Sequence, residues 1–409
     1  MTTKQTHAFA ATKTASTILA GRPDCPFMPV FGAPQVMFER GQGTQLWDVN
    51  GKRYLDFLCG IAVTSLGHSH PVIAAAIAHQ ANTLLHVSNF FANPVATQTA
   101  IMVDELVSSS SGLSSGAGQV FFCNSGAEAN EAGIKLARKF GGRGKHVVVS
   151  ALGSFHGRTL AALAATGQPE KHEPFAPMPE GFRHVVFNDI KSLETSLDNS
   201  VAAILLETVQ GEGGVIPASV EYLQAVRKIC TERGILMMID EVQTGFARTG
   251  KWFGFQHAEI EPDVVMLAKA MGNGMPIGAL WARKEIAAVF KPGDHGSTFS
   301  GTAIATAAAR ATIQLMLDMD APTVATLRGQ ELSEKLRSVN GVVEIRGRGL
   351  LLAAELRADL DAKSVATQLL EHGLVVNGVT SHALRFAPPL TVSSVEIDEA
   401  IAIIKQVLK

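Results

Sequence analysis

Three short segments of this sequence place reactive side chains directly after apolar runs of strand length. In the first, Cys123 is followed by Asn124-Ser125-Gly126-Ala127, and an amphipathic stretch then begins. Backbone N–H groups at the start of a helix, with a serine hydroxyl beside them, form a site suited to phosphate. Taken alone, the segment is better explained as an ordinary helix N-cap without a ligand.

The second segment ends in a carboxylate. Asp240 follows the apolar run Ile235–Ile239, which is typical of a buried strand. A buried carboxylate is costly unless it has a cationic or strongly donating partner, and a protonated pyridine nitrogen is one such partner. An aspartate that caps the turn after the strand explains the position equally well.

The third segment ends in an amine. Lys269 follows the apolar run Val265–Ala268 and precedes a glycine-bearing turn. A lysine in an apolar pocket has a lowered pKa and can act as a nucleophilic amine, as Schiff-base chemistry requires. Taken alone, the segment is better explained by a lysine that extends from a strand end to the surface.

The composition is that of a large globular protein. The chain has 409 residues, of which 46% are hydrophobic and 18% are charged, enough for one large domain and one or two smaller ones. The formal net charge is -2 and no long basic run occurs, so nucleic acid and anionic membranes are not expected partners. No apolar run approaches the roughly 20 residues of a membrane span, so we expect a soluble protein.

The cysteines predict a reducing compartment and no metal site. Cys25, Cys59, Cys123 and Cys230 lack CxxC or Cys/His ligand spacing, which is typical of reduced thiols in a cytoplasmic protein. Residues 1–20 lack acidic groups, as transit peptides do, but they also lack arginine and an amphipathic stripe. A flexible tail over residues 1–27 is therefore the better interpretation.

Apolar runs of strand length alternate with helical patterns through the middle of the chain. Buried strands are predicted at Gln119–Cys123, His146–Ser150, Ala202–Glu207, Ile235–Asp240, Val264–Leu267 and Ile277–Ala282. Amphipathic helices are predicted at Ala127–Phe140 and Val220–Arg233. Such alternation favours an α/β fold with a mostly parallel sheet covered by helices on both faces. Ligands of such sheets bind beyond the carboxyl ends of the strands, where the three reactive segments fall.

The pattern changes after about Thr302. Helices are predicted at Ala303–Met319 and Thr323–Ser338, followed by strand-like segments at Val342–Ile345, Leu350–Leu356, Leu374–Val376 and Leu384–Phe386. This order is typical of a separate small α/β domain. The segment before about Val63, which contains a hairpin-like pair around Asp48–Gly51, is expected to pack against it. We therefore predict an N-terminal segment at 28–75, a large domain at 76–305 and a small domain at 306–409.

Together with four further segments in a fixed order, these three segments resemble the class III aminotransferases of pyridoxal-phosphate fold type I. The matching segments are Asn124–Glu131, Phe155–Thr159, Glu207–Gly214, Asp240–Gly245, Lys269, His295–Thr298 and Arg385–Pro389. The resemblance extends from about residue 28 to the C-terminus. It implies a large domain with a mostly parallel mixed sheet between helices, a smaller α/β domain, and pyridoxal 5'-phosphate as cofactor.

The resemblance implies a role for each residue around the cofactor ring. Lys269 would hold the cofactor as a Schiff base and, once released, move a proton between substrate and cofactor. Asp240 would pair with the pyridine nitrogen and keep it protonated, so that the ring acts as an electron sink. Phe155 and Val242 would cover the two ring faces, and Gln243 would lie near the ring hydroxyl.

The phosphate group would be held from two subunits. The resemblance implies that the Ser125 hydroxyl and the N–H groups of Gly126 and Ala127 bind it from one chain. The partner subunit's Thr298 would reach it from a second chain, which makes a homodimer the functional unit.

Two arginines would select the substrates. Arg158 and Arg385 each carry a planar guanidinium group suited to a carboxylate. The resemblance implies that they bind the two carboxylates of glutamate. Arg158 alone would hold the carboxylate of the amine donor, while Glu212 pairs with Arg385. We expect Glu212 to move away when glutamate binds; a permanent ion pair is the alternative.

The segments Leu58–Val63, Leu66–Pro71 and His86–Phe91 resemble the acetylornithine aminotransferase branch of the family. That branch transfers the δ-amino group of N-acetylornithine to 2-oxoglutarate in arginine biosynthesis. The apolar Ile61 suits an acetylated donor, because ornithine aminotransferases tend to place a tyrosine near this position. Ser297 is a candidate contact for the donor.

Two departures from the family pattern leave other substrates open. Phe299–Ala303 replaces the usual Gly-Gly-Asn-Pro-like run, and Thr208 stands where proline is common. Succinyl-diaminopimelate, ornithine and 4-aminobutyrate are therefore alternative amine donors. An aminomutase or racemase on the same scaffold is the alternative reaction, because the cofactor supplies the chemistry and the pocket selects the outcome.

Overall fold

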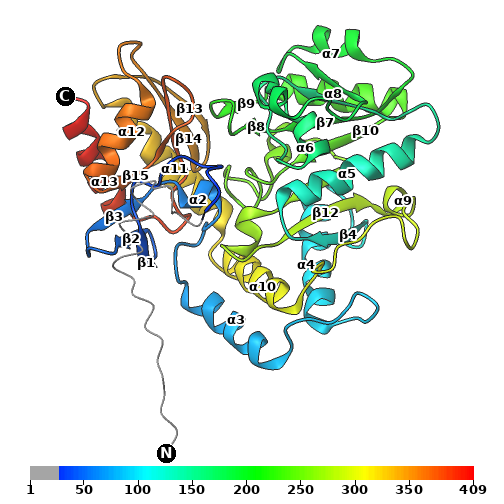
Figure 1. Cartoon of the computed structure of the whole chain (residues 1–409), viewed down its shortest axis with the longest axis horizontal. Coiled ribbons are helices and arrows are strands. Elements are labelled where there is room, and N and C mark those ends of the chain that lie inside the picture. The colour runs from blue at the N-terminus through cyan, green and yellow to red at the C-terminus, as the bar shows by residue number, and fades with distance from the viewer. Residues whose placement is uncertain (1–26) are drawn as a thin grey trace, which may run out of the picture.

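The computed structural model describes residues 27–409, which form two lobes side by side (Figure 1). The larger lobe contains a seven-stranded sheet, and the smaller lobe contains two four-stranded sheets. The tail predicted at residues 1–27 and the Cys25 thiol fall outside the described residues, apart from Phe27. The predicted domain boundaries at residues 75 and 305 stay predictions.

The large sheet has the strand order β4-β12-β11-β10-β7-β5-β6. Its strands are β4 (Gly118–Cys123), β5 (Val147–Ala151), β6 (Phe182–Val185), β7 (Val201–Glu207), β10 (Leu236–Asp240), β11 (Val264–Leu267) and β12 (Gly278–Arg283). The six strands predicted from the sequence are all present, with ends within one residue of those predicted. The edge strand β6 was missed, because a four-residue Phe-Arg-His-Val segment carries little apolar signal.

The sheet is parallel apart from β12, which pairs antiparallel with both β4 and β11. The parallel pairing of β10 with β7 and β11 brings the carboxyl ends of these strands to one edge. Alternate residues of β10 face opposite layers: Met237 and Ile239 join one core cluster, and Leu236 and Met238 join another. A strand buried on both faces must be apolar throughout, which explains its continuous apolar run.

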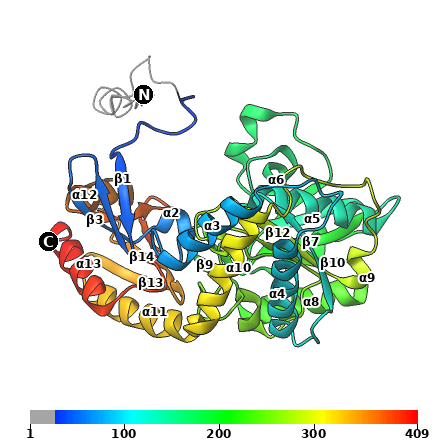
Figure 2. The same cartoon turned by 90° about the horizontal axis from the view of Figure 1, so that it is seen from below.

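Helices cover both faces of this sheet (Figure 2). The longer ones are α4 (Pro94–Ser110), α5 (Gly126–Gly141) and α8 (Val220–Arg233), and the shorter ones are α6 (Leu160–Ala165), α7 (Ile190–Ser196) and α9 (Lys284–Ala287). Apolar residues of α5 pack on the β10 face that carries Met238, whereas α8 packs on the opposite face. The large lobe thus has the helix–sheet–helix layers that the sequence predicted.

The small lobe joins the two ends of the described chain. One sheet contains β1 (Phe38–Gln42), β2 (Gln45–Asp48), β3 (Arg53–Asp56) and β15 (Leu374–Val375). The other contains β13 (Val342–Arg348), β14 (Leu351–Leu356), β16 (Asn377–Gly378) and β17 (Ala383–Phe386). Helices α11 (Ala321–Arg337), α12 (Ala362–Glu371) and α13 (Ser394–Val407) belong to this lobe. The predicted hairpin is β2–β3, and β3 pairs with β15, so the N-terminal segment packs where expected.

Further elements lie between the lobes. Helix α10 (Ala303–Asp318) packs against α3 (Pro71–Thr83) and α4, and the short strands β8 (Val209–Gln210) and β9 (Ile216–Pro217) form a hairpin. Proline begins both α3 and α4, a position where its fixed φ and missing N–H cost the helix nothing. The single-turn element α2 (Cys59–Ala62) also lies between the two lobes. Within residues 27–409, no helix is both long and apolar enough for a membrane span.

Candidate active site

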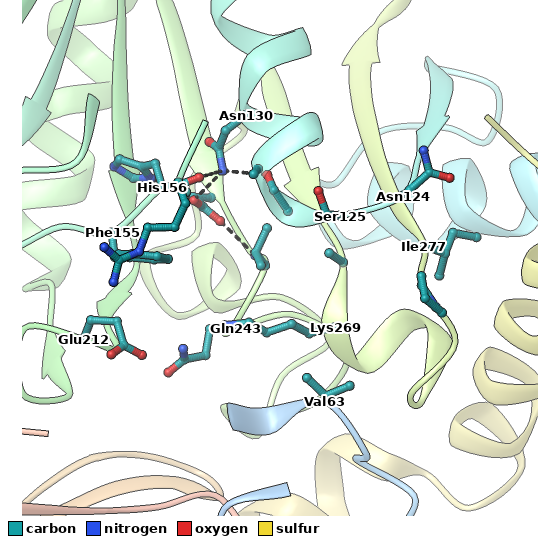
Figure 3. A pocket seen from close by; sticks show the side chains of 18 of the residues that line it. Val63, Asn124, Ser125, Asn130, Phe155, His156, Glu212, Gln243, Lys269 and Ile277 are labelled. Atoms are coloured by element: carbon teal, nitrogen blue, oxygen red, sulfur yellow. Dashed lines mark hydrogen bonds and ion pairs between the residues drawn. The ribbon is translucent and has the colours of Figure 1, made fainter. Parts of the chain in front are cut away.

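A cavity of about 360 Å³ opens at the edge where the parallel strands end. Figure 3 shows Phe155 and Glu212 on one side of it, Asn124 and Ile277 on the other, and Lys269 between them. Ten residues predicted from the sequence line the cavity: Ser125, Gly126, Ala127, Phe155, Arg158, Glu212, Asp240, Val242, Gln243 and Lys269. Chain reversal at the strand ends thus gathers residues that are up to 144 positions apart in the sequence, from Ser125 to Lys269.

Three predicted residues do not line the cavity. Arg385 is fully buried behind Glu212 and Gln243 and contacts both. Ser297 accepts a hydrogen bond from Asn124 Nδ2 at 3.0 Å, so it lies one residue away from the cavity wall. Thr298 is exposed on the surface of this chain, and its expected contact from a second subunit stays a prediction.

The first turn of α5 forms one end of the cavity. The Ser125 hydroxyl caps this helix by accepting the N–H of Glu128 at 3.2 Å, and it still has a proton to donate. The N–H groups of Gly126 and Ala127 lie in the first turn, where a helix offers no carbonyl partner. A Cβ on Gly126 would approach Val242 Cγ1 to 2.7 Å, so only glycine lets Val242 lie this close. Helix dipole, N–H groups and hydroxyl together fit an anionic phosphate.

Asp240 ends β10 and is only 4% exposed. Its Oδ2 accepts hydrogen bonds from Asn130 Nδ2 at 2.9 Å and from His156 Nδ1 at 2.8 Å. Its Oδ1 accepts the N–H of Val242 at 3.0 Å. Three donors fix the carboxylate, and no lysine or arginine pairs with it in the described part of the chain. Its charge is therefore available to a cationic group in the cavity.

Lys269 follows β11 and begins a short 3-10 turn, Lys269–Gly272. Its φ is +46°, a left-handed conformation that costs a non-glycine residue energy and that tertiary packing must hold in place. Burial lowers the pKa of its amine to about 8, the positive charge of Arg385 adds to the effect, and the carboxylates of Glu212, Asp240 and Glu207 oppose it. Roughly a tenth of the amine is therefore neutral and nucleophilic at pH 7, far more than of an ordinary lysine with its pKa near 10.4.

The two arginines differ in their partners. Arg385 Nη1 donates to Glu212 Oε1 at 2.6 Å and to the carbonyl oxygen of Gly211 at 3.2 Å. Burial raises the pKa of Glu212, but the charge and hydrogen bond of Arg385 outweigh it and hold that pKa below its ordinary value. Arg158 is exposed at the cavity wall, and no ion pair involving it occurs within residues 27–409. Its guanidinium carbon lies 5.5 Å from the centre of the Phe155 ring.

Among the cavity residues to which the sequence assigned no role, three make hydrogen bonds that organise the site. Asn130 and His156 hold Asp240, and Glu207 accepts the backbone N–H of Phe155 in the cavity wall. All three lie inside segments that carried the family resemblance, at Asn124–Glu131, Phe155–Thr159 and Glu207–Gly214. Their membership of these segments was the available signal, but only tertiary contacts reveal what each side chain touches.

The cavity residues fit pyridoxal phosphate. Lys269, an amine with a lowered pKa, matches its aldehyde. Asp240, a buried carboxylate without a lysine or arginine partner in the described residues, matches the pyridine nitrogen, and the start of α5 matches the phosphate. The described residues include no group of three or more His, Cys, Asp or Glu side chains arranged to hold a metal ion.

Comparison with known proteins agrees with this chemistry. The family described as "Aminotransferase class-III" matches residues 30–408. The acetylornithine aminotransferase of Gloeobacter violaceus is 47% identical over 389 residues, covering 93% of this chain and 95% of that protein. The N-acetylornithine aminotransferase structure from Stenotrophomonas maltophilia has a TM-score of 0.79 and 33% identity, covering 91% of this chain and 95% of that one. The ornithine aminotransferase structure from Toxoplasma gondii ME49 has a TM-score of 0.88 and 32% identity, covering 94% and 92%.

Fold and site therefore define a pyridoxal-phosphate-dependent enzyme of fold type I. More narrowly, the chain belongs to the class III aminotransferase family, and it is a pyridoxal-phosphate-dependent transaminase. Its substrates are small molecules.

Proposed function

We propose that this transaminase transfers the δ-amino group of N2-acetyl-L-ornithine to 2-oxoglutarate, a step of arginine biosynthesis. The observation that carries the proposal is the unequal state of two arginines: Arg385 is neutralised by Glu212, whereas Arg158 has no acidic partner in residues 27–409. Acetylornithine has one carboxylate and an uncharged acetamido group, so it needs one free arginine. The relatives named acetylornithine aminotransferase, at 40–47% identity, support the same donor.

The second substrate needs both arginines. Glutamate carries two carboxylates, and we propose that the second displaces Glu212 from Arg385. Glu212 is suited to such a change because its side chain is 30% exposed, whereas that of Arg385 is fully buried. The carboxylate can rotate into solvent while the guanidinium stays fixed by Gly211 and Asn377.

The wall near the turn α2 supports an acylated donor. Val63 lines the cavity, and Ile61 two residues earlier is 38% exposed and apolar. An apolar wall offers no acceptor for a charged α-ammonium group, whose burial would be costly. We propose that this wall favours the acetamido group over a free α-amino group, with Ser297 as a further contact of the donor.

We propose the following roles at the cofactor. When bound, pyridoxal phosphate supplies an electron sink that stabilises negative charge on the substrate carbon. Lys269 holds the cofactor covalently and afterwards moves the proton at that carbon, Asp240 keeps the pyridine nitrogen protonated, and Gln243 binds near the ring hydroxyl. Phe155 and Val242 cover the ring faces. Ser125, Gly126 and Ala127 bind the phosphate.

We propose that two chains form the functional unit. Phe90, Phe91 and Phe299 are 92%, 70% and 59% exposed, and an apolar patch of this kind favours association. The ring centres of His86 and Phe299 are 5.5 Å apart, so the two phenylalanine-bearing segments lie side by side. Thr298 is exposed and directly precedes Phe299, and the partner subunit's Thr298 would reach the phosphate. A dimer mass in light scattering, lost in Phe90→Asp, is the expected result; a monomeric wild type would contradict the proposal.

We also propose the cytoplasm as its location. Cys59, Cys123 and Cys230 are buried free thiols, a state that a reducing compartment maintains. Fractionation of cells that produce the natural protein tests this, and its recovery from an oxidising compartment would contradict it.

A comparison of amine donors tests the proposed reaction. We expect kcat/KM for acetylornithine to exceed that for ornithine, succinyl-diaminopimelate and 4-aminobutyrate by at least about tenfold, since a buried unmatched polar group costs more than 1.4 kcal/mol. A higher value for any of the three would identify that amine as the donor instead. Glutamate alone should convert the bound cofactor to its amine form and release 2-oxoglutarate; failure to do so would favour an aminomutase or racemase.

A further inference from the structure

Glu207 is a buried carboxylate in the cavity wall to which the proposed function gives no task. It ends β7 and lies opposite Asp240 in the register of the neighbouring strand β10. It is 6% exposed, and it lines the cavity. A carboxyl group at this place is costly, so its partners indicate what it does.

The two oxygens of Glu207 bind two different segments, the cavity wall at Phe155 and the chain at Gly211 behind it. Oε2 accepts the N–H of Phe155 at 3.1 Å, and Oε1 accepts the N–H of Gly211 at 3.3 Å. Gly211 in turn offers its carbonyl oxygen to Arg385 at 3.2 Å, and the next residue, Glu212, pairs with the same guanidinium. The carboxylate of Glu207 therefore connects Phe155, which we propose covers the cofactor ring, with Arg385, which we propose binds the second carboxylate of glutamate.

The connection is tightly packed at Gly211. A Cβ at this position would lie 2.1 Å from Gln243 Oε1, so backbone and amide are already in contact. Gln243 also accepts a hydrogen bond from Arg385 at 3.3 Å. A shift of Gly211 would therefore move Gln243 and Arg385 as well.

We propose that Glu207 is a positioning residue that fixes Phe155 and the Arg385–Glu212 pair relative to each other, and that it holds both only as the carboxylate. A carboxylate accepts at both oxygens, whereas a protonated acid presents an O–H to one of the two N–H donors and loses that bond. The inference rests on the proposed roles of Phe155 and Arg385.

The surroundings of Glu207 favour a change of charge near neutral pH. No lysine or arginine forms an ion pair with it in the described ranges of the chain. The ionisable groups facing it are His156, Asp240 and Lys269. Burial raises the pKa of Glu207 to about 7, the charge of Asp240 adds to the rise, and His156 and the two N–H groups oppose it. As pH rises through about 7, Glu207 thus becomes the carboxylate that accepts both N–H groups.

Glu207→Gln tests this, with Glu241→Gln as the matched control. The amide can accept only one of the two N–H bonds, so it mimics the protonated acid at every pH. Glu241 is equally buried, and burial likewise raises its pKa to about 7. Its partners are Thr244, Gly254 and Phe255, none of which lines the cavity.

The first readout is the pH profile of the glutamate half-reaction in the holoenzyme, followed by the cofactor absorbance. At pH 8 we expect Glu207→Gln to be about tenfold slower in kcat/KM than the wild type, the effect of one lost buried hydrogen bond. At pH 6 the two should agree within about twofold, and Glu241→Gln should follow the wild type throughout. Equal profiles for Glu207→Gln and the wild type, or a uniform loss at all pH values, would overturn the proposal.

The second readout is the melting temperature of the cofactor-free proteins. Because the folded-state pKa of both glutamates is about 7 and the ordinary value is near 4.5, the fold loses stability as pH rises from about 4.5 to about 7, and the loss is complete above 7. Both variants should gain stability over the wild type at pH 8 and gain less at pH 5; a pH-independent difference for Glu207→Gln would contradict the inference. If Glu207→Gln does not fold, the pH profile of the wild-type glutamate half-reaction decides. A wild-type rate that does not rise as pH increases through 7 would overturn the proposal. Glutamate alone is used, so failure of acetylornithine as donor would affect only the proposed function.

Discussion

The imidazole of His156 donates from Nδ1 to Asp240 Oδ2 over 2.8 Å, joining the loop after β5 to the end of β10. Both side chains are buried, and Asn130 Nδ2 donates to the same oxygen. This arrangement fixes the orientation of the carboxylate that we expect to face the pyridine nitrogen. Side chains that orient a ligand-binding group in this way typically contribute strongly to the affinity for the ligand.

The first prediction concerns this contact. His156→Ala should weaken cofactor binding by roughly tenfold, because one hydrogen bond to a charged group is lost. His156→Asn, whose amide can donate, should recover part of the affinity. Absorbance titration of the cofactor-free protein measures both. His79→Ala, an exposed histidine on α3, is the control, and an unchanged dissociation constant in His156→Ala would contradict the prediction.

The second prediction concerns the amine. In Lys269→Ala, kcat should fall by at least about 10³-fold, because both the covalent link to the cofactor and the group that moves the proton are lost. The fold should persist, as judged by circular dichroism, and the exposed Lys251→Ala should behave as the wild type. Borohydride reduction of the wild type should attach the cofactor to Lys269, which peptide mass spectrometry locates. Substantial turnover in Lys269→Ala would rule out its catalytic role.

The third prediction concerns pH and the cofactor-free protein. Because burial lowers the folded-state pKa of Lys269 to about 8 from 10.5, the protonated amine destabilises the fold below pH 8. This cost fades as pH rises from about 8 to 10.5, and it is on the order of 3 kcal/mol. Lys269→Met should therefore exceed the wild type in unfolding free energy at pH 7, with a smaller difference at pH 10. A difference that is the same at both pH values in urea unfolding would show that the amine is not desolvated.

The fourth prediction concerns Arg158. Its replacement by alanine should raise KM for acetylornithine and for glutamate by roughly 10- to 100-fold, since each loses a charge-assisted hydrogen-bonded pair. The cofactor absorbance should stay unchanged. Arg143→Ala, at an exposed position, serves as the control in the same steady-state assay. Unaltered KM for both substrates would exclude Arg158 from carboxylate binding.

The fifth prediction concerns Glu212. Glu212→Gln leaves the buried Arg385 without its acidic partner, so kcat/KM for acetylornithine should fall about tenfold. Glutamate brings its own carboxylate, so its kcat/KM should change by less than about twofold. The exposed Glu221→Gln is the control. Equal losses for the two substrates would indicate a permanent structural pair instead of an exchange of partners.

The central strands of the large sheet, β5, β7, β10, β11 and β12, could be located from the sequence because they are buried on both faces and must be apolar. This is why Val264–Leu267 was predicted with its observed ends. Where burial is weaker, the prediction failed: β6 is a short edge strand, and β13 continues beyond Ile345 through Arg346, Gly347 and Arg348. Those residues are strand only because β14 pairs with them.

The sequence by itself determined the order of strands and helices and the position of Ser125, Asp240 and Lys269 at or just beyond strand ends, because these depend on local apolar patterns. Only the tertiary structure decided which side chains meet: His156 with Asp240 across 84 positions, and Glu212 with Arg385 across 173. Such contacts depend on the paths of the loops after the strands and on which polar groups are buried away from water. The spacing of residues along the chain reveals neither the loop paths nor the buried groups.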